Sequence, residues 1–317
     1  MRASMRSTGW TGWTALGVGL TLLLGSCGNG TTTAAPSTSP GSPGSGVLTV
    51  VAAENFWGSI AAQLGGSHVA VTSIITNPDT DPHTYEPTTG VARTVASAKY
   101  VVVNGVGYDP WAPKLLAAQP SPGRRVLTVG DLVGVKEGGN PHRWYSPADV
   151  MKVIDQITSD YKALDPADAA FFETQHSTYT TTGLAGYTSL IADIKARYAG
   201  TPVGASESIF APLSDALGLH LLTPPTFLTA ISEGTDPTAA DKAAIDAQIK
   251  GHQIKVYVFN SQNSTPDVAA QVKEAKDAGI PTTTITETLE PPTSTFQDWQ
   301  TAQLRSLEAV LASATGK

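Results

Sequence analysis

The sequence predicts an α/β protein with two Rossmann-like lobes, each built on a parallel β-sheet. Short runs of apolar and β-branched residues alternate with helical stretches, the pattern of strands that helices cover on both faces. This alternation occurs twice, and residues 148–200 between the two series show helical patterns without a strand. At 317 residues the chain is also long for one domain. We therefore expect two α/β lobes joined by a long helical segment.

The first lobe is predicted to span residues 47–147. It opens with the β-branched run Val47–Ala53, and Glu54 and Asn55 then begin a helical stretch that ends at Gly65 and Gly66. The other elements expected here are strands at 69–75, 100–103 and 126–128 and helices near 89–98 and 111–118.

The second lobe is predicted to span residues 201–317. Asp236-Pro237 and Thr265-Pro266 are typical helix starts, because a capping side chain precedes a proline of the first turn. The expected strands are 203–205, 220–222, 255–259 and 282–285, and the expected helices lie near 209–217, 238–250, 265–278 and 295–313.

Residues 1–26 have the pattern of a secretory signal peptide. Arg2 and Arg6 precede the apolar stretch Trp13–Leu24, which is shorter than the roughly 20 residues of a membrane-spanning helix. The following Leu24-Gly25-Ser26-Cys27 resembles a bacterial lipobox, in which cleavage before the cysteine leaves Cys27 as the site of lipid attachment. The sequence therefore predicts an extracytoplasmic protein that is lipid-anchored to the cell membrane through Cys27.

The composition after Cys27 and the net charge narrow the possible partners. Residues 27–46 are rich in Gly, Ser, Thr and Pro and are predicted to form a flexible tether. The net charge is −7 without runs of one sign, which disfavours a nucleic-acid partner. Because Cys27 is the only cysteine, a disulfide within the chain is excluded.

Polar loops follow three of the predicted strands, at the carboxyl ends where doubly wound sheets bind ligands. Two of these loops carry a histidine directly after a proline, His83 and His142, and the third carries Glu207. Imidazole nitrogen suits zinc, copper or ferrous iron, and a carboxylate also admits manganese. The alternatives are that the histidines only cap helices in stiff loops and that Glu207 stabilises a helix N-terminus. The acidic Glu86 is a candidate to orient one of the histidines.

The order and spacing of several fragments resemble those of the metal-binding receptors of bacterial ABC importers that take up zinc or manganese, the cluster A-I family. The matching fragments are Glu54-Asn55-Phe56-Trp57-Gly58, Asp81-Pro82-His83 with Tyr85-Glu86-Pro87, Asn104-Gly105 with Tyr108-Asp109-Pro110-Trp111, Asn140-Pro141-His142-Arg143-Trp144, Glu207 with Phe210, and Gly279-Ile280-Pro281 before Glu287-Thr288. The resemblance implies two α/β lobes joined by a long rigid helix, with the metal ion in the cleft between the lobes.

The resemblance also implies the ligands His83, His142 and Glu207, and a position where this chain departs from the family. Many members have an aspartate in the loop that follows the strand at 255–259, whereas here that loop reads Asn260-Ser261-Gln262-Asn263-Ser264. An amide oxygen of Asn260, Gln262 or Asn263, or a water molecule, is available to complete the metal shell, and of these we expect Gln262, with Asn260 as the next candidate.

The other four histidines are predicted to be surface or packing residues. They are His68, His176, His220 and His252.

The resulting prediction is a monomeric binding protein, not an enzyme, that captures Zn²⁺ or Mn²⁺ as its transported ligand and delivers it to an ABC permease. One alternative is a two-lobed receptor for an organic solute, against which the paired histidines argue. The other is an exported zinc hydrolase, since two histidines, a glutamate and water also form a catalytic zinc shell. The chain lacks the His-Glu-x-x-His and Gly-x-Ser-x-Gly motifs of such enzymes.

Overall fold

The computed structural model describes residues 46–263 and 265–317. The predicted signal peptide, Cys27 and nearly all of the predicted tether lie outside these residues. The described residues belong to one compact unit. Across the described ranges, no helix has both the length and the apolar character needed to cross a membrane.

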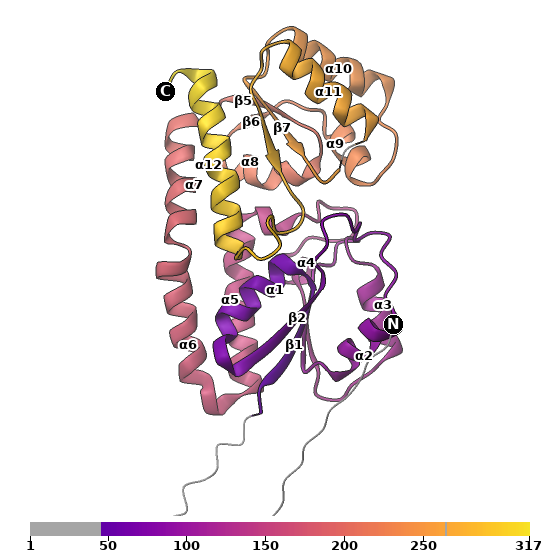
Figure 1. The fold of residues 1–317 in the computed structure, drawn as a ribbon, viewed down its shortest axis with the longest axis vertical. Coiled ribbons are helices and arrows are strands. Elements are labelled where there is room, and N and C mark those ends of the chain that lie inside the picture. The colour runs from indigo at the N-terminus through magenta and orange to yellow at the C-terminus, as the bar shows by residue number, and fades with distance from the viewer. Residues whose placement is uncertain (1–45, 264) are drawn as a thin grey trace, which may run out of the picture. The chain divides into compact units, whose positions relative to one another are not determined.

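The first sheet has four parallel strands in the order β2-β1-β3-β4. Helices α1 and α5 (Pro147–Leu164) cover one face of this sheet, and α2 and α3 cover the other (Figure 1). Alternate residues of β1 and β3 pack with the first pair of helices, and the remaining ones pack with the second pair. The elements are β1 (Leu48–Glu54), α1 (Asn55–Gly65), β2 (Val69–Ile75), α2 (Thr89–Ser97), β3 (Tyr100–Val103), α3 (Trp111–Ala118), β4 (Arg125–Thr128) and α4 (Val129–Val133).

Glu54 joins β1 to the first helix. It is the N-cap residue of α1, as its expected place at the helix start indicated, and it is also the last residue of β1, where it pairs with Ile75 of β2. Its side chain is consequently buried within the lobe.

The second sheet repeats the order of the first, as β6-β5-β7-β8, and all of its strand pairs are parallel. The prediction missed helix α9. The elements are β5 (Pro202–Ala205), α8 (Ala211–Leu217), β6 (His220–Leu221), α9 (Pro225–Ser232), α10 (Ala239–Lys250), β7 (Val256–Asn260), α11 (Pro266–Asp277), β8 (Thr282–Ile285) and α12 (Phe296–Thr315).

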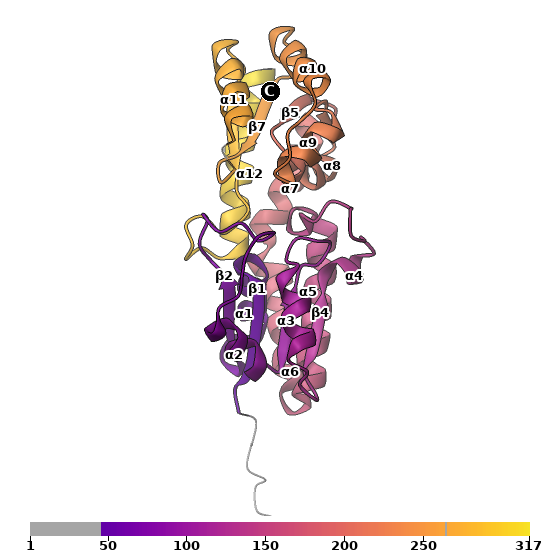
Figure 2. The same cartoon turned by 90° about the vertical axis from the view of Figure 1, so that its right-hand side faces the viewer.

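A strand-free helical segment connects the two sheets, as the sequence predicted. It consists of α5 (Pro147–Leu164), α6 (Ala169–Thr178), a π-helical turn at Tyr179–Gly183 and α7 (Ala185–Tyr198). Helix α12 packs along α7 and also contacts α1 of the first sheet (Figures 1 and 2). The predicted class of two parallel-sheet α/β lobes is confirmed.

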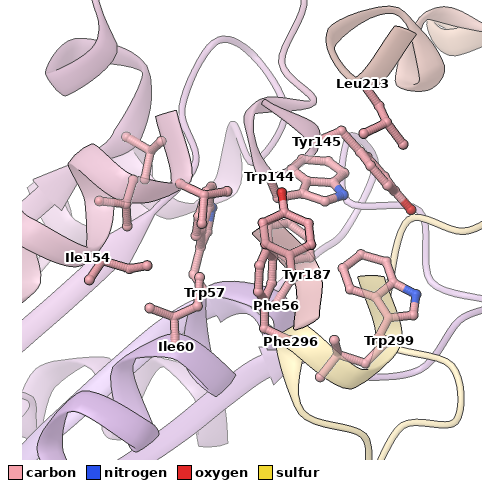
Figure 3. Close-up of a cluster of buried hydrophobic side chains, with 14 of the residues drawn as sticks. Phe56, Trp57, Ile60, Trp144, Tyr145, Ile154, Tyr187, Leu213, Phe296 and Trp299 are labelled. Atoms are coloured by element: carbon pink, nitrogen blue, oxygen red, sulfur yellow. The ribbon is translucent and has the colours of Figure 1, made fainter. Parts of the chain in front are cut away.

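Aromatic side chains from both series of elements pack into one core (Figure 3). Trp144 stacks on Phe56 with ring centroids 4.1 Å apart, and Tyr145 lies 5.6 Å from Trp299 of α12. Trp144 and Tyr145 are fully buried. The loop around His142 is therefore built directly on the rigid interior of the protein.

Candidate metal centre

Three side chains of types that bind metal ions converge from three loops. One ligand atom from each of His142, Glu207 and Glu287 lies within 4.8 Å of the others. Glu207 follows β5 and Glu287 follows β8, while His142 precedes a 3-10 turn at Arg143–Tyr145. His142 and Glu207 are each 1% exposed, and Glu287 is partly exposed.

An Asn-Pro-His turn fixes the orientation and tautomer of His142. The side-chain oxygen of Asn140 accepts hydrogen bonds from the His142 backbone N–H (3.0 Å) and from its ring Nδ1 (2.8 Å). The Asn140 amide nitrogen donates to the Ser208 carbonyl at 2.7 Å, which identifies the other atom as the oxygen. Because an amide oxygen only accepts, Nδ1 carries the proton and Nε2 keeps its lone pair.

An Asp-Pro-His turn does the same for His83. The Asp81 carboxylate accepts from the His83 backbone N–H at 2.9 Å and from its ring Nδ1 at 3.1 Å. Nε2 of His83 is thus also left with a lone pair. Asp81 takes the orienting role that we considered for Glu86, whose side chain is exposed.

His83 stands at the edge of the cluster and is half-buried. It lines two neighbouring cavities of about 490 and 510 Å³, the first of which Glu287 also lines. Its ring lies 5.1 Å from that of Tyr108, which in turn lies 5.9 Å from the ring of His142. The two predicted histidines therefore lie on either side of the buried Tyr108 ring, and His83 is the more exposed of the two.

Asn260 donates to the carboxylates of the cluster through its amide nitrogen. Nδ2 bonds Glu207 at 2.9 Å and Glu287 at 3.0 Å, and Asn263 donates to the second Glu207 oxygen at 2.6 Å. The Asn260 side-chain oxygen accepts from the Gln262 backbone N–H at 2.9 Å. This geometry turns the amide oxygen of Asn260 away from the cluster.

The Gln262 side chain is hydrogen-bonded to the segment that carries Glu287. Its side-chain oxygen accepts from the N–H groups of Glu287 (2.8 Å) and Thr288 (3.0 Å), and its amide nitrogen donates to the Thr288 hydroxyl at 3.1 Å. The structure therefore engages the Gln262 side chain with this backbone and places Glu287, which sequence reasoning did not select as a ligand, beside His142 and Glu207.

Tyr108 links the two lobes at the cluster. Its hydroxyl donates to a Glu287 carboxylate oxygen at 2.7 Å, and its ring is fully buried. Glu287 is thus held by Tyr108 from the first lobe and by Asn260 from the second.

The electrostatics of the cluster favour a bound cation. Burial, followed by repulsion from Glu287, raises the pKa of Glu207 to about 8, and burial also raises the pKa of Glu287. Burial, followed by the charge of His83, lowers the pKa of His142 to about 3, so His142 is neutral at physiological pH. A divalent cation would relieve the repulsion between the carboxylates, and the N/O donor set suits zinc or manganese.

The other histidines have positions compatible with surface roles. His68 pairs with Asp168 at 2.8 Å and His176 pairs with Asp155 at 2.8 Å. His220 and His252 are exposed. His68, Asp165 and Asp168 form a second group with metal-ligand spacing, partly exposed and already engaged in that ion pair.

Comparison with known protein families gives a match over most of the chain. The family model described as ZnuA, zinc-uptake complex component A, periplasmic, matches residues 50–310. The chain belongs to this family. The resemblance seen in the sequence fragments is confirmed.

Individual members of the family are distant from this chain. The manganese-binding lipoprotein MntA of Halalkalibacterium halodurans is 26% identical over 139 residues, which are 42% of this chain and 45% of the relative. The zinc-binding lipoprotein AdcA of Streptococcus pneumoniae is 24% identical over 226 residues, 64% of this chain and 42% of the relative. The zinc uptake protein ZnuA of Bacillus subtilis is 22% identical over 261 residues, 75% of this chain and 77% of the relative. The match thus spans less than half the length of the first two relatives.

Solved structures share the fold. A manganese-bound periplasmic metal binding protein from Candidatus Liberibacter asiaticus superposes with a TM-score of 0.69 at 21% identity, over 83% of this chain and 99% of that one. Zinc-bound AdcA from Streptococcus pneumoniae gives a TM-score of 0.63 at 20% identity, over 84% of this chain and 58% of that one.

Proposed function

We propose that this protein captures a divalent transition-metal ion, Zn²⁺ or Mn²⁺, outside the cytoplasm and delivers it to the permease of an ABC importer. The observation that carries the proposal is the convergence of His142, Glu207 and Glu287 within 4.8 Å, with His83 at the mouth of the site. Membership in a family named for zinc uptake supports it.

The proposed ligands are Nε2 of His83, Nε2 of His142, and the carboxylates of Glu207 and Glu287. Neutral imidazoles and ionised carboxylates are the forms that bind metal, so capture requires the Glu207–Glu287 pair to release its proton. In this proposal the protein binds and releases the ion without catalysing a reaction. Asn260 and Gln262, our sequence-based candidates for the fourth ligand, instead hold the carboxylates and the Glu287 segment in place.

The proposed anchor is Cys27, with residues 27–46 as a tether to the lobes at 47–147 and 201–317 and the connecting segment 148–200. Such a tether would keep a loaded protein close to a membrane permease. Cys27→Ser is expected to move the protein from the membrane fraction to the soluble fraction, and equal membrane retention of both forms would contradict the anchor.

The experiment that tests capture is a zinc and manganese titration of the protein from Gly46 to Lys317 after chelator treatment. The wild type is compared with the double variant His83→Ala, His142→Ala and with the control His176→Ala, which removes a histidine of a surface ion pair. We expect stoichiometric tight binding in the wild type and in the control, and its loss in the double variant. Binding that does not depend on the two histidines would instead favour a receptor for an organic solute.

The fourth ligand is tested by a second pair of variants. Glu287→Gln is expected to weaken binding far more than Gln262→Ala, because only the first change removes a proposed metal-binding atom. The reverse order would restore Gln262 as the ligand.

A further inference from the structure

Behind the candidate metal centre, two carboxyl groups are buried together in the first lobe. Glu54 at the end of β1 is 0% exposed, and Asp109 in the loop after β3 is 1% exposed. Neither takes part in an ion pair with a lysine, arginine or histidine of residues 46–263 and 265–317. Burying two negatively charged carboxylates without a cation would strongly destabilise the folded protein, so at least one of the two groups is expected to be protonated.

Asp109 has the environment of an ionised carboxylate. One of its oxygens accepts from the Asn104 backbone N–H at 2.8 Å and the other from the Gly105 N–H at 2.8 Å. These bonds close a loop in which Gly105 and Val106 have positive φ angles of 73° and 59°. Burial raises the pKa of Asp109, and donation by these two N–H groups opposes that rise, so Asp109 has donors that stabilise its charged form.

Glu54 has the opposite environment. Neither of its carboxyl oxygens has a hydrogen-bond donor among the described residues. Glu54 ends β1 beside β3, and Asp109 bonds the backbone of Asn104 directly after β3, so the two carboxyl groups are neighbours. Burial, followed by Asp109, raises the pKa of Glu54. Two neighbouring carboxyl groups form a hydrogen bond only when one of them carries a proton, and the proton belongs on the group that lacks other donors.

The loop that Asp109 closes carries groups of the metal centre. The Asn104 side chain donates to the Pro141 carbonyl at 2.9 Å, next to His142, and accepts from the Trp57 indole N–H at 3.1 Å. Tyr108 of the same loop donates to Glu287. The position of this loop therefore determines where Tyr108 meets the carboxylate across the cleft.

We propose that Glu54 is a positioning residue that stays protonated in the native protein, and that its O–H donates to Asp109 and so fixes loop 104–109 beneath the metal centre. The groups facing the pair are Asp109 and Tyr108 from this loop and, beyond Tyr108, Glu287 and Glu207. The proton assignment stands on its own, while its effect on metal affinity rests on the proposed function.

The proton is tested by infrared spectroscopy of the full chain in dodecyl maltoside, a detergent without a carbonyl group. We expect the wild-type minus Glu54→Gln difference spectrum at pH 7 to contain the C=O stretching band of a protonated carboxylic acid. We expect the band to persist at pH 8. Absence of this band at pH 7 overturns the proposal, whether or not the protein binds metal.

The positioning role is tested by two substitutions of similar volume. The amide of Glu54→Gln donates to Asp109 as the acid does, so manganese affinity is expected to stay within about threefold of wild type. Glu54→Leu cannot donate and is expected to lower affinity roughly 10- to 100-fold, the usual effect of losing a group that orients a ligand. Equal losses in both variants, or none in either, would refute positioning by the proton.

The two proposals fail in distinguishable ways. If Glu54→Leu does not fold, the comparison of Glu54→Gln with wild type and the infrared band still decide the protonation. A wild type that shows the band but binds neither zinc nor manganese refutes the proposed function and leaves the proton assignment intact.

Discussion

Replacing Glu207 by glutamine is expected to stabilise the metal-free protein at high pH while abolishing metal binding. Glu207 is buried with Glu287 beside it, and burial followed by this neighbour raises its pKa from an ordinary value of 4.5 to about 8. Below pH 4.5 this carboxyl group is protonated in both the folded and the unfolded protein, and the stability of the folded protein is fully present. As the pH rises from 4.5 through about 8, the unfolded protein releases the proton more easily than the folded one, and that stability is lost. The wild type should therefore become less stable over this range in the presence of a chelator.

The size of the effect follows from the same pKa. A rise of the Glu207 pKa from 4.5 to about 8 corresponds to a loss of at most about 5 kcal/mol in the free energy of unfolding above pH 8. Both Glu207 oxygens accept from amide groups of Asn260 and Asn263, and a glutamine loses one of these bonds, at a cost of about 1–2 kcal/mol. We expect the variant to be about 1–3 kcal/mol more stable than wild type at pH 9 and less stable at pH 4.5.

The assay is urea unfolding of both proteins at pH 4.5, 7 and 9 with chelator, repeated with manganese. Added manganese should stabilise the wild type and leave the variant unchanged, because a ligand stabilises only the state that binds it. A stability difference between the two proteins that does not change with pH would refute the raised pKa. The proton is shared within the pair, so Glu287→Gln should show the same direction.

Three further substitutions probe the remaining parts of the site. Loss of a residue that only orients a metal ligand typically lowers metal affinity roughly 10- to 100-fold, so His142→Ala, which removes a proposed ligand, should lower zinc affinity by more than this. Calorimetric titration measures the change, and an unchanged affinity would remove His142 from the ligand set. Asn140→Ala should free the imidazole to exchange tautomers, which nitrogen NMR of the metal-free protein would detect as a changed Nδ1 signal, whereas an unaltered signal would show that Asn140 does not fix it. Tyr108→Phe removes the bond to Glu287 and should lower manganese affinity roughly tenfold, with about 1 kcal/mol lost in urea unfolding. A normal affinity with reduced stability would make Tyr108 purely structural.

The sequence was most informative where strong local patterns coincide with the fold. Continuous apolar runs marked the buried parallel strands, and the two Pro-His loops marked His83 and His142. The same three-residue pattern also contains the residue that orients each histidine. The side chain before the proline, Asp81 or Asn140, accepts hydrogen bonds from both the backbone and the ring of its histidine. Such short-range hydrogen bonds depend on three adjacent residues and are therefore accessible from sequence.

Glu287, a ligand that we propose from the structure, was not selected from the sequence although its signal was present. It follows the predicted strand 282–285 closely, the same kind of position that pointed to Glu207 after β5. The role of Gln262 was not accessible in this way, since its bonds to the backbone of Glu287 and Thr288 join segments 25 and 26 residues apart. Glu54 was placed correctly at the start of the first helix, of which it is the N-cap, but its pairing with Ile75, which extends β1 by one residue beyond Ala53, depends on a distant strand.

The segment that carries Glu287 has a consequence for cutting the chain. After β8 the chain bonds back to the first lobe: the Tyr145 hydroxyl donates to the Thr286 carbonyl at 2.7 Å, and the Phe296 N–H donates to the Ser59 hydroxyl at 2.9 Å. Proteolysis between β8 and α12 would therefore leave α12 packed on α1 and α7, whereas a fragment ending before Thr286 would expose apolar surface on α1. We expect the fragment that ends after β8 and the fragment that contains α12 to reassemble when they are mixed. We do not expect either fragment to fold as a separate domain.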